Sequence, residues 1–309
     1  MFQSMHYIYE VYKEMNFSKA AKNLYISQPS LSAAVKKEEQ RLGFPIFDRS
    51  TNPIQLTEFG QQYIRAIEQV MDVERSFENF VNDINDLKIG SVSIGATNLF
   101  ASHILPPILS RFTEKYPAVR VNLMEASTTE LTEKLLSGSL DLIIENTELD
   151  PLVYGKAFFC KEHMILTVPK KFESNQKAAA YALTADEIKS GRHLEDSFPS
   201  VPLQTFAQDP FLFLKSGNDT RTRADRICHN HHFTPNIKLK LDQQITAYNL
   251  TCYGLGISFN GDTLICHVPS DENLLFYKLD SKESVRSVNF YYKQNRYMTR
   301  AVREFLRCI

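Results

Sequence analysis

The sequence has 309 residues, enough for two or three domains. Hydrophobic residues make up 43% of the chain and charged residues 23%, which is ordinary for globular proteins and excludes a largely disordered chain. The 35 basic residues nearly balance the 36 acidic ones, giving a net charge of −1. The overall charge therefore does not indicate nucleic-acid binding, although a small basic domain could be diluted by a larger neutral one.

Compartment signals are weak but consistent. The sequence has no run of about 18 apolar residues, the length needed to cross a bilayer. The segment Met1–Glu14 has acidic residues and no small-residue cleavage site, unlike a signal peptide. The five cysteines are scattered and form no C-x-x-C pair, which argues against a disulfide framework. We expect a cytoplasmic protein that does not bind membranes. We expect its cysteines to be core thiols, and the sequence leaves open whether one of them is redox-active.

The N-terminal region contains three short helical patterns. Apolar residues at helical spacing over Met5–Met15 predict the first helix. Ser18 can cap a second helix over Lys19–Leu24. Ser27 can cap a third that ends at Gly43. Two short helices joined by a tight turn are typical of a helix-turn-helix.

The outer face of the third helix is polar and basic, which suits the major groove of DNA. The residues on this face are Gln28, Ser30, Ser32, Ala33, Lys36, Lys37 and Gln40. Residues 17–50 contain six basic side chains (Lys19, Lys22, Lys36, Lys37, Arg41 and Arg49) and three acidic ones (Glu38, Glu39 and Asp48). Composition alone supports a solvated face in an unrelated helical bundle equally well.

Two short extended segments follow, Phe44–Arg49 and Pro53–Leu56, and they can pair as a small hairpin, or wing. Thr57 can then cap a long helix. These elements predict a winged helix-turn-helix over residues 1–60, a DNA-binding domain if the polar face of its third helix meets DNA.

Residues 58–88 predict one long linker helix with a heptad-like apolar seam. The seam consists of Tyr63, Ile67, Val70, Phe77, Val81 and Ile84, interrupted by Glu74 and flanked by Val73, Phe80 and Leu87. Such a seam predicts a coiled coil with the same helix of a second copy. The alternative is a core helix within one chain.

Residues 91–309 alternate between strand and helix patterns, which predicts an α/β domain with parallel strands. The first unit comprises strands over Ser91–Thr97, Ala118–Glu125 and Leu140–Ile144, with helices over Leu105–Tyr116 and from a capping-box pattern at Ser127–Glu130. We expect subdomain I at about 91–163 and 265–309, and subdomain II at about 164–264. Two such subdomains form a hinged clamp like that of periplasmic binding proteins, and we expect it to serve as an effector domain.

Ligands of such sheets bind beyond the carboxyl ends of the strands, near helix N-termini. The candidate effector-binding residues are Thr97, Asn98, Ser102, Ser127, Thr128, Thr129, Lys215, Ser216, Gly217, Asn218 and Thr220. Hydroxyls, helix N–H groups and one lysine suit a small organic anion. The alternative is that these Ser and Thr residues only cap helices.

The N-terminal region resembles the winged helix-turn-helix of LysR-type transcriptional regulators. The matching strings are Phe17-Ser18-Lys19-Ala20-Ala21, Leu24 to Ser32, Leu42 to Arg49 and Leu56-Thr57-Glu58-Phe59-Gly60. Weaker matches to the sensing domain of the family are Ile94-Gly95, Leu105-Pro106, Phe112, Tyr116-Pro117, Gly138 to Leu142 and Gly254 to Ile257. The resemblance implies a dimer or tetramer on inverted-repeat double-stranded DNA, a metabolite effector that changes its geometry there, and a contact with RNA polymerase.

The resemblance and the polar helix face together give the candidate DNA-binding residues. They are Ser27, Gln28, Pro29, Ser30, Ser32, Ala33, Lys36, Lys37 and Arg49. Gln28 can bind adenine through two hydrogen bonds, and Ser32 can serve a phosphate or a base edge. Ala33 stands where the family often has a basic residue. Glu38 lies on the inward stripe, so we expect it to reach the rim or to pair with a cation such as Arg41.

The sequence gives weaker support for other functions. The run Cys228-His229-Asn230-His231-His232 has adjacent rather than spaced ligands, so we expect no metal there. The sequence lacks G-x-S-x-G, G-x-G-x-x-G, phosphate-loop and H-E-x-x-H motifs, so we expect neither an enzyme nor a cofactor. A ligand-independent DNA-binding repressor and an enzyme with a fused DNA-binding head stay open as alternatives.

Overall fold

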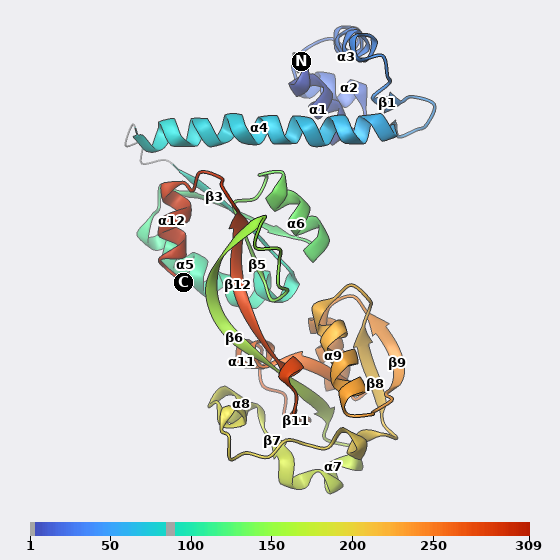
Figure 1. Cartoon of the computed structure of the whole chain (residues 1–309), viewed down its shortest axis with the longest axis vertical. Helices are drawn as coiled ribbons and strands as arrows, with labels where there is room; N and C mark the ends of the chain where they lie inside the picture. Colours follow the sequence, from blue (N-terminus) through green and yellow to red (C-terminus); the bar gives the residue numbers. More distant parts are fainter. Residues whose placement is uncertain (1–3, 85–89) are drawn as a thin grey trace. The chain divides into compact units, whose positions relative to one another are not determined.

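The computed structural model describes residues 4–84 and 90–309, and the chain divides into two compact units (Figure 1). The first unit holds the N-terminal helices and the long helix α4, and the second holds nearly all residues from 90 onward. No helix within the described residues is both long and apolar enough to cross a membrane.

The first unit begins with three helices that share one apolar core. They are α1 (Met5–Glu14), α2 (Phe17–Asn23) and α3 (Gln28–Leu42). The side-chain oxygen of Asn16 accepts the backbone N–H of Lys19 at 3.0 Å, so Asn16 caps α2. The prediction of Ser18 as this cap was wrong, because α1 already ends in a left-handed turn at Met15.

The predicted ends of α3 and the wing are confirmed. The Ser27 hydroxyl accepts the backbone N–H of Ser30 at 3.2 Å at the start of the helix. Gly43 ends the helix with φ +81°, a conformation that glycine adopts without steric cost. Strands β1 (Phe47–Asp48) and β2 (Gln55–Leu56) then pair antiparallel as the expected hairpin.

The inward carboxylate of Glu38 is buried and fully engaged. It accepts hydrogen bonds from the Arg41 guanidinium, with Nε at 3.0 Å, and from the Tyr63 hydroxyl at 2.8 Å. The hydrogen bond from Arg41 is the main cause of the lowered pKa of Glu38. The expected pairing with Arg41 is therefore confirmed, and Tyr63 is a second partner that the sequence pattern did not indicate.

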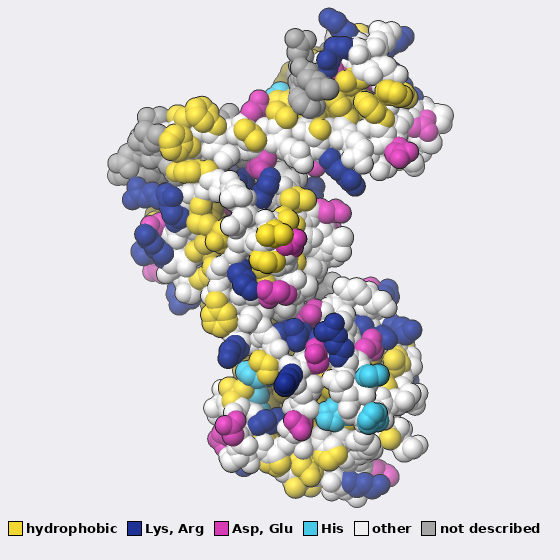
Figure 2. Space-filling model, viewed as in Figure 1, with side chains coloured by type: hydrophobic (Ala, Val, Ile, Leu, Met, Phe, Trp, Pro, Cys, Tyr) yellow, Lys and Arg dark blue, Asp and Glu magenta, His cyan; other side chains and the backbone are white. Residues whose placement is uncertain are grey.

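Helix α4 (Glu58–Ile84) has two different halves. Thr57 caps it by accepting the backbone N–H of Gly60 at 2.9 Å, as expected. In the first half Tyr63 and Ile67 are buried in the core of the same unit, as the intramolecular alternative requires. In the second half apolar side chains lie in solvent, and Figure 2 shows hydrophobic side chains gathered over this part. These exposed residues are Val73, Phe77, Phe80 and Val81. The predicted seam residue Leu87 and the predicted helix end Lys88 lie outside the described residues.

The second unit contains two sheets that share one long strand, β6 (Tyr154–Pro169). In the first sheet the strand order is β4-β3-β5-β12-β6. The other strands are β3 (Ser91–Ala96), β4 (Arg120–Glu125), β5 (Leu142–Glu145) and β12 (Val285–Lys293). Strand β3 pairs parallel with β4 and β5, which confirms the expected parallel sheet. The helical segments of this half are η1 (Phe100–Ile104), α5 (Leu105–Lys115), α6 (Thr128–Leu136) and α12 (Arg300–Leu306).

In the second sheet the order is β6-β10-β8-β9, and β11 and β7 are added beside β6. The strands are β7 (Ala182–Leu183), β8 (Pro210–Leu214), β9 (Asn236–Leu241), β10 (Ile257–Gly261) and β11 (Leu274–Lys278). The α-helices are α7 (Ser174–Lys177), α8 (Ala185–Lys189), α9 (Asp219–Asn230), α10 (Gln244–Cys252) and α11 (Asp262–His267). Short 3₁₀ turns are η2 (Ala179–Tyr181), η3 (Arg192–Leu194), η4 (Leu203–Phe206) and η5 (Lys282–Ser284).

Strand β6 crosses from one sheet to the other at His163. It pairs with β12 up to His163 and with β10 and β11 from Met164 onward. Strand β11 lies within the segment expected to return to subdomain I near Ile265, yet it pairs with β6 and β7 in the second sheet. The chain returns to the first sheet with β12, at Val285. A local apolar pattern marks β11 as a strand but carries no information about its sheet.

Replacement of Tyr63 by Phe tests the buried contact with Glu38. The variant leaves a buried carboxylate with one donor fewer, so we expect it to lower the free energy of unfolding of the first unit by about 2 kcal/mol. Urea unfolding of the full-length protein, followed by circular dichroism, measures this. The control is Tyr25→Phe, because Tyr25 is 96% exposed and should change stability by less than about 0.5 kcal/mol. Equal unfolding midpoints for the two variants would contradict the assignment.

Candidate DNA interface and ligand pocket

The outer face of α3 presents the predicted DNA-binding side chains to solvent, and basic side chains gather over this helix in Figure 2. The exposed residues are Ser27, Gln28, Pro29, Ser30, Ala33, Lys36 and Lys37. Ser32 is half-buried, and the hydroxyls of Ser27 and Ser30 lie 2.7 Å apart. Gln28 therefore lies in the first turn of α3, next to the capping residue Ser27, whose side chain is hydrogen-bonded to Ser30 of the same helix.

Half of the basic residues counted in this region are paired with acidic side chains. Arg41 pairs with Glu38, Arg49 with Glu39, and Lys19 with Glu14. Among the described residues, no ion pair is found for the other three, which are Lys22, Lys36 and Lys37. The positive charge available to a phosphate backbone is thus concentrated on these three lysines.

The guanidinium of Arg49 is held against α3 rather than extended into solvent. Its Nη2 lies 3.0 Å from a Glu39 carboxylate oxygen, and its Nη1 donates to the Ser32 hydroxyl at 3.4 Å. It also covers the ring of Phe17, with the guanidinium carbon 4.9 Å from the ring centre. These contacts give Arg49 a structural role in attaching the start of the wing to α3.

The second unit contains a cavity of about 160 Å³ at the carboxyl ends of parallel strands from both sheets. Most of the predicted effector-binding residues line it: Thr97, Ser127, Thr128, Thr129, Lys215, Ser216, Gly217, Asn218 and Thr220. Two do not. The Asn98 amide donates to Glu125 at 2.8 Å, and Ser102 is exposed away from the lining.

Sequence reasoning missed several lining residues, namely Leu99, Phe100, Glu145, Asn146, Thr147, Asp219, Asp242, Gln243 and Gln244. Glu145 ends β5, and Asp242 follows β9. The rule that ligands bind beyond the carboxyl ends of parallel strands would have found both, had it been applied to every strand.

Three helices begin in the cavity lining: α6, α9 and α10. The first backbone N–H groups of a helix have no intrahelical acceptor and favour negative charge. Some are capped here, since Ser127 accepts the N–H of Glu130 at 3.3 Å and Asn218 that of Thr220 at 2.9 Å. The side-chain nitrogen of Gln244 is buried and has no hydrogen-bond partner among the described residues. The lining therefore offers several donors to a polar ligand.

Glu145 is the buried acceptor of the lining. Its carboxylate is 2% exposed and accepts the Thr128 hydroxyl at 2.9 Å. Burial raises the pKa of Glu145 to about 7, because removal from water disfavours the charged form. The charges of two other lining carboxylates are balanced, since Asp242 lies 2.8 Å from Lys215 and Asp219 is paired with arginines. Lys215 is thus already paired, which reduces its attraction for an anion.

A buried arginine fixes the start of α9. Arg286 of β12 is bound to Glu162 of β6 at 2.6 Å, to Asp219 at 2.8 Å and to the Thr220 hydroxyl at 3.0 Å. The side chains of Arg286 and Glu162 are at most 1% exposed. Asp219 also pairs with Arg223, one turn along α9. The pocket rim formed by Asp219 and Thr220 is therefore attached to β12 directly and, through Arg286 and Glu162, to β6.

Four of the five thiols are buried or half-buried, and the histidine run is not part of any group of three metal ligands among the described residues. Burial raises the pKa of Cys160, Cys228 and Cys252 to about 12, so these thiols are protonated at neutral pH. His231 bonds the Asp280 carbonyl at 2.6 Å, and the other histidines of that run do not join it in a ligand group.

Comparison with known proteins identifies both units. Residues 2–61 match the family described as "Bacterial regulatory helix-turn-helix protein, lysR family", and residues 85–309 match "LysR substrate binding domain". The chain belongs to the LysR family of transcriptional regulators. The resemblance expected from the sequence is thereby confirmed, and this LysR regulator is a DNA-binding protein with a winged helix-turn-helix and an α/β effector domain.

Relatives and solved structures agree with this assignment. The regulator is 28% identical over 305 residues to "Uncharacterized HTH-type transcriptional regulator YcgK" of Bacillus subtilis, covering 98% of this chain and 91% of the relative. It is 26% identical to a "Probable RuBisCO transcriptional regulator" of Cyanidioschyzon merolae, with coverages of 94% and 91%. A full-length OxyR variant from Pseudomonas aeruginosa shares the fold, with TM-score 0.72, 20% identity and coverages of 98% and 92%. Names of this kind support a regulator rather than an enzyme.

Replacement of Glu145 by Gln tests its burial in this LysR regulator. The folded protein binds the Glu145 proton more tightly than the unfolded chain, because the pKa rises from 4.5 to about 7. This stabilisation is complete below pH 4.5 and is lost as the pH rises through about 7, a change of about 3 kcal/mol. We expect Glu145→Gln to be more stable than wild type at pH 8, with a smaller difference at pH 5.

Thermal unfolding midpoints at both pH values measure the effect. The control is Glu133→Gln, since Glu133 is an exposed residue of α6. This surface substitution should change the unfolding midpoint little. If the unfolding midpoint of Glu145→Gln differs from that of wild type by the same amount at both pH values, the carboxylate is not buried as described.

Proposed function

We propose that this chain is a ligand-responsive, sequence-specific regulator in which a small metabolite, bound between the two subdomains, changes the geometry of the oligomer on its promoter. The observation that carries the proposal is the polar cavity at the carboxyl ends of strands from both sheets, in a chain that also presents a winged helix-turn-helix. A ligand there would contact both subdomains, so its binding energy could favour one arrangement over another.

The domain assignment is part of this proposal. Residues 1–60 form the DNA-binding domain, residues 58–88 the linker helix and residues 91–309 the effector domain. The family matches at 2–61 and 85–309 support these limits. The protein acts in the cytoplasm, where promoter DNA and RNA polymerase are its further partners.

Self-association is proposed through the second half of α4. Val73 is 70% exposed and Phe77 66%, beside the exposed Phe80 and Val81. Apolar side chains at these spacings on a helix favour pairing with an equivalent helix. The occupant that fits best is a second copy of this chain, since a dimer would place two recognition helices on two halves of an inverted-repeat operator. A solved LysR structure, CbnR, is described as complexed with its target DNA, and it shares the fold with TM-score 0.65 and 16% identity.

The effector class follows from the lining. Three helix starts and the Gln244 amide donate hydrogen bonds, which suits a carboxylate or another small organic anion. Glu145 lines the same cavity and is a hydrogen-bond acceptor, so the same ligand should also present a hydrogen-bond donor. We therefore propose a small polar metabolite that carries both an acid group and a donor group.

The DNA interface is tested by Gln28→Ala and Lys36→Ala on the full-length protein. The operator is first selected from a random DNA library, and affinity is then measured on operator and on random DNA at several salt concentrations. We expect Gln28→Ala to lose about 1–3 kcal/mol on the operator and little on random DNA. Lys36→Ala should weaken binding to both DNAs. It should also reduce the slope of log affinity against log salt concentration by about 1 per chain bound.

The matched control for Lys36 is Lys240→Ala, since Lys240 is a lysine of β9 outside the DNA-binding domain and should change neither affinity. If Gln28→Ala weakens binding to both DNAs equally, Gln28 does not read bases. If neither variant weakens binding, α3 is not the interface.

The pocket is tested by screening metabolites for a shift in the thermal unfolding midpoint and in the DNA footprint. For a ligand found in this way, Gln244→Ala should weaken binding about tenfold, the loss of one hydrogen bond. The control is Asn98→Ala, because Asn98 lies beside the pocket without lining it. A ligand-independent repressor would give no ligand, or one that leaves the footprint unchanged, and turnover of the ligand would indicate an enzyme.

A further inference from the structure

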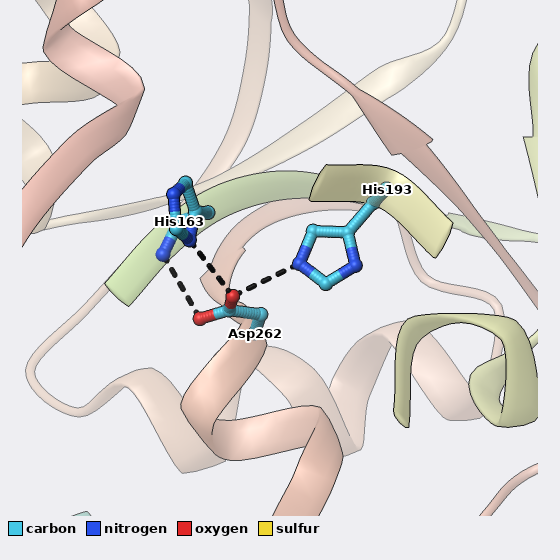
Figure 3. A group of neighbouring side chains, drawn as sticks. All are labelled: His163, His193 and Asp262. Atoms are coloured by element: carbon cyan, nitrogen blue, oxygen red, sulfur yellow. Dashed lines mark hydrogen bonds and ion pairs between the residues drawn. The ribbon is translucent and has the colours of Figure 1, made fainter. Parts of the chain in front are cut away.

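Two histidines and one aspartate converge at the point where β6 crosses between the sheets (Figure 3). His163 belongs to β6, His193 to η3, and Asp262 is the first residue of α11. One ligand atom from each of them lies within 4.8 Å of the other two. The three residues are 30 or more positions apart in the sequence, so no local motif indicates the cluster.

The contacts aim all three side chains at one point. His163 Nδ1 lies 3.1 Å and His193 Nε2 2.9 Å from the same oxygen, Oδ2 of Asp262. The other oxygen accepts the backbone N–H of His163 at 2.9 Å, which fixes the orientation of the carboxylate. Ligand atoms around a tetrahedral Zn²⁺, each about 2.0–2.1 Å from the metal, lie about 3.3 Å apart. The two distances from the ring nitrogens to Oδ2 are within a few tenths of an ångström of that separation. The two ring nitrogens lie within 4.8 Å of each other, so a bound ion would draw the two imidazoles closer together.

The charge of the cluster is unbalanced unless a cation is present. Asp262 is 8% exposed and forms no ion pair with lysine or arginine among the described residues. A buried carboxylate needs a positive partner. A divalent metal ion bound by two neutral imidazoles would supply it.

We propose that His163, His193 and Asp262 bind a divalent transition-metal ion such as Zn²⁺, with a fourth position open to water. Two imidazoles and one carboxylate are a common ligand set for such ions. The side chain of His163 is 27% exposed, which gives the ion a path from solvent.

The position of the site gives it a structural consequence. A bound ion would connect the crossover residue of β6 to η3 and to the start of α11, which follows β10. It would therefore stiffen the second sheet next to the crossover. This role is separate from the proposed effector pocket, whose lining contains none of the three residues.

We expect the cluster to bind a metal ion with moderate affinity. Nδ1 of His193 is buried and has no hydrogen-bond partner among the described residues. Metal-binding histidines usually donate this second N–H to an acceptor, and loss of such a partner costs about 10–100-fold in affinity. We expect one ion per chain with a dissociation constant in the micromolar range.

The test uses full-length protein treated with a chelator and then titrated with ZnCl₂ in a calorimeter. Wild type should take up one Zn²⁺ per chain at the site and show a higher thermal unfolding midpoint. His163→Ala should bind at this site at least about 100-fold more weakly, since the loss of a ligand costs no less than that of a supporting residue. The control His231→Ala retains the cluster and should bind as wild type does.

Co²⁺ provides a second measurement on the wild-type protein, independent of the folding of any variant. Binding to two imidazoles and a carboxylate should produce visible absorption that Zn²⁺ removes. Absence of stoichiometric Zn²⁺ uptake by wild type would overturn the proposal and leave a protonated imidazole as the partner of Asp262. Wild-type affinity in His163→Ala, or its loss in His231→Ala alone, would overturn it equally.

Discussion

The buried guanidinium of Arg286 is the interaction on which the effector domain depends. It joins Glu162 of β6 to Asp219 at the start of α9, from a position on β12. A charge without water must be paired, and removal of one partner from such a network is strongly destabilising. The shared strand β6 and its neighbour β12 are thus attached to each other and to one rim of the pocket. A ligand that contacts α9 therefore acts on a helix held directly by these two strands.

Two neighbouring residues of β6 make contacts on opposite faces of the strand. Successive side chains of a strand point to opposite faces, so Glu162 faces Arg286 while His163 faces Asp262. Gly261 lies between these groups, and a Cβ atom there would collide with the carboxylate of Glu162. Glycine is thus required where β10 ends, which allows Asp262 to begin α11 beside His163. The crossover is specified by close packing of charged groups, whereas the sheets around it are specified by apolar burial.

The sequence predicts best where structure is decided locally. The cap at Ser27, the left-handed Gly43 and the wing all follow from nearby residues, and the family resemblance covers the same stretch. The pocket rule found Thr128 and Thr220 because it depends only on where strands end. Long-range partners could not be read in this way. The sheet to which β11 belongs, the contact of Tyr63 with Glu38 and the cluster around Asp262 are all set by tertiary packing.

Charge explains why DNA binding by this regulator should depend on pairing. Its net charge is −1, and ion pairs with Glu14, Glu38 and Glu39 neutralise Lys19, Arg41 and Arg49 of the helix-turn-helix region. Three lysines are left per chain, and each phosphate contact contributes a salt slope of only about −0.9. So few contacts give weak binding to a single half-site. Two chains joined through the apolar half of α4 would double the contacts and bind the second half-site at high effective concentration. If the proposed pairing through α4 holds, the exposed Val73 and Phe77 would matter as much for operator affinity as the lysines of the proposed DNA-binding face.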